Sequence, residues 1–178
     1  MNTDLEQLAA ADGVEPRGDA FDWGRTEREL QMVVPQDFRD LLDAGGAGVW
    51  FDHIALYAPD PRYKNQNLLR SAGKFGDLEQ FWEDGDEVPP DDLPEGARLI
   101  AWADTPAGDV LYWAVQDGVA PEDYPIYVGH PDGEEWRRFE MQTTQFLAAI
   151  GRGDLGNPLF SEDAYLHLDR PYQPYTFV

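Results

Sequence analysis

Hydrophobic side chains in the N-terminal quarter of the chain recur at helical spacing. Leu5 and Leu8 lie three positions apart, which favours a short helix within the first dozen residues. Asp22 is suited to cap a second helix, and Pro35 to begin a third, because proline is favoured in the first turn. Gly45 and Gly46 follow this third helix, so we expect one of them to end it in a left-handed conformation.

The middle of the chain shows the patterns of strands. Residues 48–57 mix aromatic and branched side chains and are expected to form one or two strands. Four more strands are predicted over Arg98–Ala103, Val110–Val115, Tyr124–Gly129 and Glu134–Phe139, separated by turn-forming residues. The second of these four is apolar on both of its alternating faces, which is typical of a central strand covered on both sides.

Two further helices follow from the spacing of apolar residues. The longer one is predicted over residues 65–83, with Leu78, Phe81 and Trp82 on its apolar side. The other is predicted over Thr143–Ile150. Between the longer helix and the next strand, a stretch rich in acidic residues and proline is expected to form an extended solvated loop.

These elements predict an α+β protein in which helices flank a central, mostly antiparallel sheet of about five strands. A length of 178 residues is typical of one domain, so we expect residues 1–178 to form a single unit. Residues 154–178 are expected to form a C-terminal extension packed on the domain, because aromatic side chains at that density would otherwise be exposed.

The net charge of −22 narrows the range of partners. Hydrophobic residues make up 42% of the chain, so the charge surrounds a folded core and does not indicate disorder. Repulsion between like charges argues against nucleic acids and anionic membrane surfaces as partners, and favours a basic protein. The alternative is that the acidity serves only solubility.

The cellular setting is predicted from what the sequence lacks. The chain has no cysteine, which excludes disulfides and thiolate metal sites and fits a reducing cytoplasm. The first twelve residues lack the basic and apolar regions of a signal peptide. The apolar runs are shorter than the roughly 20 residues that span a bilayer. We therefore expect a cytoplasmic protein.

The sequence contains no pattern typical of an active site, since both the nucleophile elbow and the phosphate-binding loop are missing. His53, His130 and His167 lack the pairing of a helical zinc site. Asp104 is expected to cap a turn, and Asp109 to bind nearby backbone amides. We expect no enzyme activity, no metal and no cofactor. A deep pocket holding a buried pair from Asp104, Asp109 and His53 would instead indicate an enzyme.

The order of motifs between residues 21 and 153 resembles the SUKH superfamily, in particular the branch related to fungal cell-wall assembly regulators. The most specific stretch is Asp-Thr-x-x-Gly-Asp-x-x-x-Trp, and it begins at Asp104. Gln31 and Ala101 depart from the usual pattern, which has glycine and proline at those places. The residues that carry the resemblance, and that we expect to be structural, are Trp23, Glu27, Pro35, Asp37, Phe38, Gly46, Gly48, Asp104, Thr105, Gly108, Asp109, Trp113 and Trp136.

The resemblance implies an α+β fold whose core spans about residues 21–153 and, for bacterial members, the role of an immunity protein. Such a protein binds and neutralises a polymorphic toxin, often a nuclease or deaminase, and the negative charge suits a basic toxin domain. We expect it to act as a monomer or weak dimer. The fungal relatives imply an alternative, a regulatory or scaffolding module with several partners.

Two groups of residues are candidates for contact with the toxin. An acidic segment is expected to steer the partner. Trp50 and Trp82 are candidate anchors if they are exposed, and core residues if they are not. The acidic segment consists of Asp84, Asp86, Glu87, Asp91 and Asp92.

Overall fold

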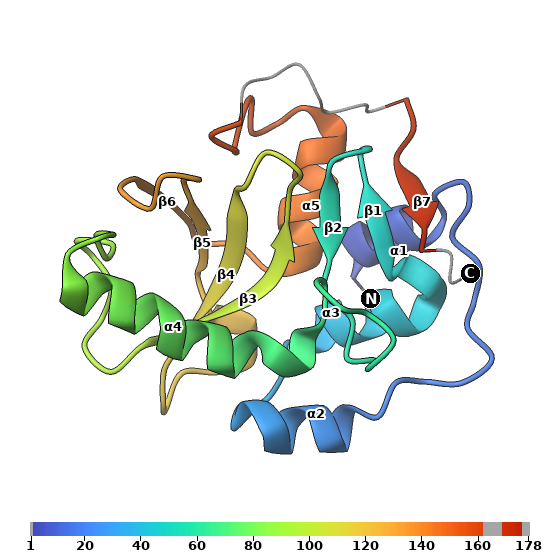
Figure 1. Ribbon diagram of the computed structural model, residues 1–178. Coiled ribbons are helices and arrows are strands. Elements are labelled where there is room, and N and C mark those ends of the chain that lie inside the picture. The colour runs from blue at the N-terminus through green and yellow to red at the C-terminus, as the bar shows by residue number, and fades with distance from the viewer. Residues whose placement is uncertain (1, 162–168, 176–178) are drawn as a thin grey trace.

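The computed structural model describes residues 2–161 and 169–175, and seven strands in this part of the chain form one sheet (Figure 1). The strand order is β6-β5-β4-β3-β2-β1-β7, and all neighbouring pairs are antiparallel. The strands are β1 (Gly48–Trp50), β2 (Ile54–Leu56), β3 (Arg98–Asp104), β4 (Val110–Val115), β5 (Ile126–Gly129), β6 (Trp136–Phe139) and β7 (Tyr172–Pro174). The predicted α+β class is confirmed, with more strands than the five or so expected.

Two local features account for the additional strands. The chain reverses between β1 and β2, where Phe51 and Asp52 adopt positive φ angles of 56° and 58°. The segment predicted as one or two strands therefore forms two. The last strand, β7, comes from the C-terminal extension and pairs with β1, with Tyr172 opposite Trp50.

Helices cover both faces of the sheet (Figure 1). α4 lies across one face against β3, while α1, α3 and α5 contact one another on the other face. The α-helices are α1 (Thr3–Ala9), α2 (Trp23–Leu30), α3 (Gln36–Leu41), α4 (Ser71–Asp84) and α5 (Thr143–Arg152). Shorter turns are η1 (Leu42–Gly46), η2 (Leu68–Arg70) and η3 (Pro121–Asp123). The helix predicted over residues 65–83 thus begins later, as the η2 turn continued by α4.

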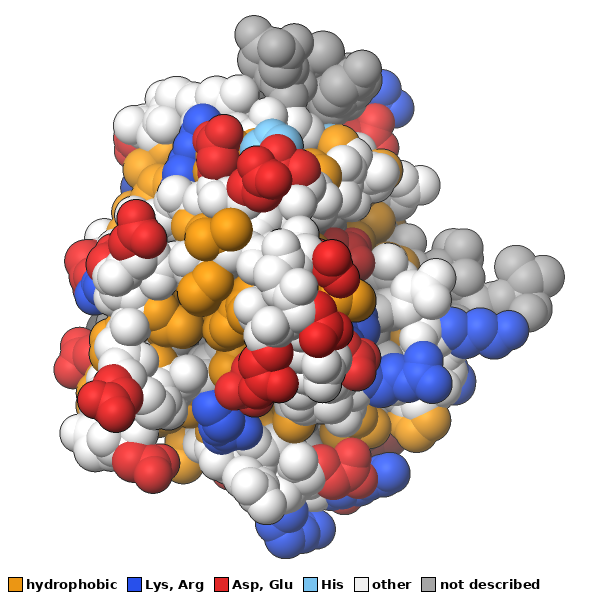
Figure 2. Space-filling model, turned by 60° about the vertical axis from the view of Figure 1, so that its left-hand side comes forward, with side chains coloured by type: hydrophobic (Ala, Val, Ile, Leu, Met, Phe, Trp, Pro, Cys, Tyr) orange, Lys and Arg blue, Asp and Glu red, His pale blue; other side chains and the backbone are white. Residues whose placement is uncertain are grey.

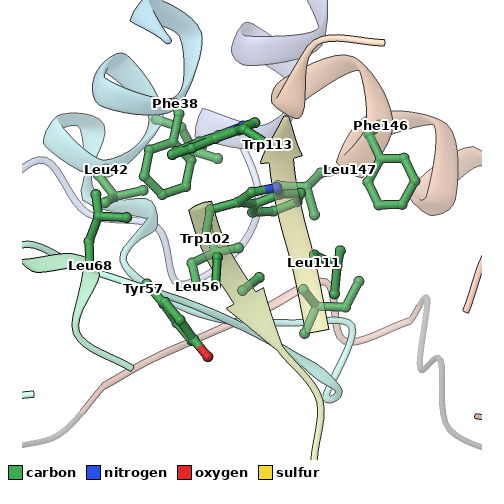
Figure 3. Packing of buried hydrophobic residues seen from close by; sticks show 14 of the residues in the cluster. Phe38, Leu42, Leu56, Tyr57, Leu68, Trp102, Leu111, Trp113, Phe146 and Leu147 are labelled. Carbon is green, nitrogen blue, oxygen red and sulfur yellow. The ribbon is translucent and has the colours of Figure 1, made fainter. Parts of the chain in front are cut away.

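Large aromatic side chains fill the core beneath α3 and α5 (Figure 3). The rings of Trp102 and Trp113 stack with their centres 6.0 Å apart. Phe38 of α3 meets Trp113 edge-on at 4.9 Å, and Phe146 of α5 meets Trp102 edge-on at 6.2 Å. Burial of this apolar surface is the main stabilising contribution to such a fold.

A smaller cluster lies between α4 and the opposite face of the sheet. Phe75 and Leu78 of α4 pack there with Leu99 of β3 and Tyr127 of β5. Ala114 of β4 belongs to this cluster, whereas the neighbouring positions of β4 belong to the larger core. The prediction that β4 is a central strand covered on both sides is therefore confirmed.

Two glycines near β1 are required by close approaches of the backbone. Gly45 has φ 108°, and a Cβ atom there would lie 1.8 Å from the carbonyl oxygen of Glu15. A Cβ atom on Gly48 would lie 2.3 Å from the carbonyl oxygen of Gln173 in β7. Gly45 therefore provides the expected left-handed end of the helical segment, and Gly48 allows β7 to pair with β1.

The described parts of the C-terminal extension pack on the domain. Leu159 is buried, and Tyr172 donates a hydrogen bond of 2.7 Å from its hydroxyl to the carbonyl oxygen of Gly45. The hydroxyl of Tyr175 reaches the carbonyl oxygen of Leu56 at 2.9 Å. The expected packing of the extension holds for these residues, while His167 lies outside the described part.

Candidate protein-binding site

The acidic segment runs from the end of α4 into the following loop. Four of its members, Asp84, Asp86, Asp91 and Asp92, are exposed, and Glu87 is half-buried. α4 ends at Asp84 because Gly85 adopts a left-handed conformation with φ 78°. The segment is therefore an exposed surface, as the charge pattern predicted.

Hydrogen bonds hold the loop against the turn between β5 and β6. The amide of Val88 donates to the carbonyl oxygen of Gly133 at 2.9 Å. The indole Nε1 of Trp136 donates to the carbonyl oxygen of Val88 at 2.7 Å. These two contacts fix the loop to a part of the chain more than 40 residues away.

This arrangement adds a second group of acidic residues to the first. The β5–β6 turn carries Asp132, Glu134 and Glu135, all of which are exposed. Sequence analysis missed their contribution because nothing local to the turn shows that it contacts the loop after α4. The density of carboxylates beside Gly133 was the one signal present. Carboxylates from two distant segments therefore share one end of the molecule.

A groove lies between α4 and the sheet beside these carboxylates, and we call it the α4 groove. Its volume is about 290 Å³. Leu78 and Phe81 of α4 line one side, Val110 and Tyr112 of β4 line the base, and Trp136 of β6 also contributes. Figure 2 shows hydrophobic side chains within a hollow on this face and acidic side chains around it.

Phe81 is the most unexpected member of the groove. The helical pattern assigned it to the buried side of α4, but its exposed fraction is 45%. α4 buries only Ser71, Phe75 and Leu78, at a spacing of four and then three residues. Phe81 continues this row one turn beyond the buried part of the helix. An exposed aromatic ring beside other apolar groups is typical of a contact surface.

Acidic groups form the charged part of the groove lining. Asp77 of α4 is exposed, and the Glu87 side chain lies against Gly133. Burial, followed by the neighbouring charge of Asp86, raises the pKa of the Glu87 carboxyl above its ordinary value. Lys74 also lines the groove, but its ammonium donates to the Tyr57 hydroxyl and to a backbone carbonyl. With two carboxylates and one ammonium in its lining, the groove has an excess of negative charge.

The two candidate tryptophan anchors occupy different environments. Trp50 is fully buried, and its Nε1 donates to the carbonyl oxygen of Gly46 at 3.1 Å. Trp50 is therefore a core residue, and its proposed role as an anchor is wrong. Trp82 is half-buried and packs edge-on against Phe75 and Trp136. Its ring packs against Trp136, which lines the α4 groove, and is not a freely projecting anchor.

Asp109 is buried, and its hydrogen bonds connect the β3–β4 turn to the C-terminal extension. Its carboxylate accepts hydrogen bonds from the Thr105 hydroxyl at 2.9 Å and from the amides of Phe160 and Ser161 at 2.9 and 3.1 Å. The Ser161 hydroxyl also donates to it. Asp109 does accept from backbone amides, but not from the nearby ones that were predicted, because these amides belong to the C-terminal extension. Gly108, with φ 100°, forms the turn itself.

Other residues of the family-like motifs also have structural contacts. Trp113 donates from Nε1 to the Thr143 hydroxyl at 2.9 Å, and Asp37 accepts from the amide of Thr144 at 2.8 Å. Both contacts hold the start of α5. Phe38 packs against Trp113, the carbonyl oxygen of Gly46 accepts from Trp50, and Gly48 lies against β7.

The remaining motif residues hold α2 and α3. Trp23 donates from Nε1 to the carboxylate of Asp43 at 2.8 Å. Glu27 accepts from the amide of Val34 at 3.1 Å and from Arg39 at 2.9 Å. Pro35 is the residue before α3, one position earlier than expected. The contacts of Trp23 and Glu27 therefore join α2 to the segment before α3, to α3 itself and to η1.

The residues considered for acid–base chemistry have other partners. Asp104 does not cap its turn, because its carboxylate accepts from the Tyr57 hydroxyl at 2.9 Å and lies beside the Gln66 amide. Burial raises the pKa of Asp104, and these hydrogen bonds and Lys74 oppose the shift. His53 lies 3.0 Å from the Ser161 hydroxyl, and burial lowers its pKa.

Ser161 therefore lies between the Asp109 carboxylate and the His53 imidazole. In serine hydrolases the imidazole lies between the serine and the carboxylate, where it removes the hydroxyl proton. The arrangement here joins three segments of the chain. Among the described residues, no three histidine or acidic side chains gather as a metal-binding group.

Comparison with known proteins adds no family assignment. No family model, no curated protein and no solved structure matches this chain. Over residues 2–161 and 169–175, no helix has the length and apolar character needed to cross a membrane.

Proposed function

We propose that the protein is an immunity protein that binds a basic toxin domain, of the nuclease or deaminase type, and neutralises it by direct contact in the cytoplasm. The observation that carries this proposal is the α4 groove, where exposed apolar side chains lie among carboxylates from two distant segments. The resemblance of the motifs to the SUKH superfamily supports the choice of a toxin as the partner. The complex would contain one copy of each protein.

The physical basis of the proposal is complementarity of charge. Enzymes that act on nucleic acids carry cationic surfaces, because they bind phosphates. A protein with a net charge of −22 attracts such a surface over long distances, which can raise the association rate by about 10–10³-fold. The apolar part of the groove then supplies the short-range contacts that keep the complex together.

Co-expression with the product of the adjacent gene tests this function. The adjacent product alone should arrest growth, and co-expression with this protein should restore it. Equal survival with and without the protein would contradict the proposal. Several partners of modest affinity, with no toxic neighbour, would instead indicate the regulatory or scaffolding module.

A further inference from the structure

We propose that the α4 groove binds a cationic segment of the partner that carries one apolar anchor side chain flanked by lysine or arginine. This inference rests on the proposed function, because it assumes a basic protein partner. It adds the place of contact and the chemistry of the contacting segment.

The apolar base of the groove defines the anchor. Tyr112 and Trp136 lie with their ring centres 5.6 Å apart, and Phe81 contributes an exposed ring from α4. Gly129 permits this arrangement, because a Cβ atom there would approach the Trp136 ring to 3.0 Å. An aromatic or branched aliphatic side chain entering the groove would cover this apolar surface, which is the usual role of an interface anchor.

The charges around the base define the flanking residues. Asp77 and Glu87 line the groove, and the rest of the acidic segment follows Glu87 along the chain. A bound lysine or arginine would offset the repulsion between Glu87 and Asp86 and would favour the ionised form of Glu87. Anionic ligands, including nucleic acids, would meet repulsion from the same groups.

The size of the groove also favours a protein segment. Its volume of about 290 Å³ is at the lower limit of typical small-molecule sites. The β5–β6 turn and the acidic segment extend the charged surface beyond the groove itself. A partner segment leaving the groove would therefore remain in contact with carboxylates. A small apolar groove beside these carboxylates suits a segment with one inserted apolar side chain and lysine or arginine residues on either side of it.

Synthetic peptides provide the probe for this inference. The protein of residues 1–178 would be titrated with Lys-Arg-Trp-Lys-Arg and Lys-Arg-Leu-Lys-Arg, with Lys-Arg-Ala-Lys-Arg and Glu-Glu-Trp-Glu-Glu as comparisons. Amide chemical shifts in nuclear magnetic resonance spectra report where each peptide binds. We expect the first two peptides to shift amides of α4, β4 and the β5–β6 turn in a saturable manner. The alanine peptide should bind at least about tenfold more weakly, and the acidic peptide should not bind.

Substitutions in the protein locate the binding site independently. Phe81→Ala should weaken binding of the tryptophan peptide by about tenfold or more, whereas Val33→Ala, at another exposed hydrophobic position, should not. Asp77→Asn should weaken binding more than Glu79→Gln, which removes the same charge from an exposed position two residues along α4. Spectra of each unbound variant verify that it is folded.

Two outcomes would overturn the inference. One is that no basic peptide binds in a saturable manner. The other is that the alanine peptide binds as tightly as the tryptophan and leucine peptides, and that Phe81→Ala leaves binding unchanged. Either result would leave the proposed function intact if co-expression still neutralises the adjacent toxin. Peptide binding in the groove without neutralisation would instead remove the toxin function and retain the groove as a peptide site.

Discussion

Glu87 connects local electrostatics with binding at the scale of one residue. Its carboxyl is half-buried beside Gly133 and close to the charge of Asp86. Within residues 2–161 and 169–175, no lysine or arginine forms an ion pair with it. A group kept ionised in such a place lowers the stability of the unbound fold. The same group strengthens attraction to a cationic partner. Binding residues often reduce stability in this manner.

Glu87→Gln should therefore stabilise the unbound protein. The folded-state pKa of Glu87 lies above its ordinary value of 4.5, so its ionisation reduces stability as the pH rises through that range. At pH 7 the variant should melt at a higher temperature than wild type, and the difference should disappear below pH 4.5. Thermal unfolding followed by circular dichroism measures this.

The control for this prediction is Glu79→Gln, which removes a charge from an exposed position of α4, the helix that precedes the Glu87 loop. It should not show the same dependence on pH. If Glu87→Gln melted below wild type at neutral pH, the carboxylate would be a stabilising group, and the electrostatic account of the groove would be wrong.

α4 illustrates how an element can be shaped by more than helix stability. Only a narrow stripe of this helix is buried. The helix also contains Gly73 and Gly76, where an added Cβ atom would meet no other atom within 4 Å. Neither glycine is required by the backbone or by packing. Gly85, which ends the helix, also has free space around it, but its φ is 78°. The two kinds of glycine therefore have opposite expectations.

Gly76→Ala should stabilise the protein by about 0.5–1 kcal/mol, because alanine restricts the unfolded chain and favours the helix. Gly85→Ala should destabilise it by about 1 kcal/mol, because a left-handed conformation is unfavourable for a residue with a Cβ atom. Denaturant unfolding of the two variants gives both values. Equal effects of the two substitutions would contradict the described end of α4.

The elements that sequence predicted well are those with a local signal. β3, β4, β5 and β6 follow from alternation and turn residues, and α5 follows from its apolar spacing, although it continues to Arg152, two residues beyond its predicted end. β7 could not be predicted, because it has three residues and exists through its pairing with β1. Its pairing depends on Gly48, whose role is visible only once both segments are placed together.

The candidate site was predicted only in part, because only some of its features have a local signal in the sequence. The acidic segment is a local run of charge, and its exposure follows from composition and proline content. The exposure of Phe81 and the burial of Trp50 depend on where α4 and β1 lie against the rest of the fold. Helical spacing identifies the apolar side of α4 but not the point where the covering sheet ends.

At the scale of the whole molecule, part of the negative charge lies beside the α4 groove. The net charge of −22 is carried by a folded α+β body, and the loop after α4 and the β5–β6 turn bring part of it to one end. That end also contains the α4 groove, where apolar side chains are accessible. Long-range attraction and short-range contact thus belong to one surface in this account.

The most direct test is the association rate with the purified product of the adjacent gene, measured by stopped-flow fluorescence across a range of salt concentrations. The comparison is between wild type and a variant with Asp84→Asn, Asp86→Asn, Asp91→Asn and Asp92→Asn. A control variant neutralises four exposed acidic residues near the N-terminus, which are Glu6, Asp12, Glu15 and Asp19.

The wild-type association rate is expected to fall by about tenfold or more between 50 and 500 mM salt. The variant of the acidic segment should associate more slowly at low salt and depend less on salt, while the control variant should remain closer to wild type. A rate that is independent of salt, or equal losses in the two variants, would contradict the claim that this end of the molecule captures a basic partner.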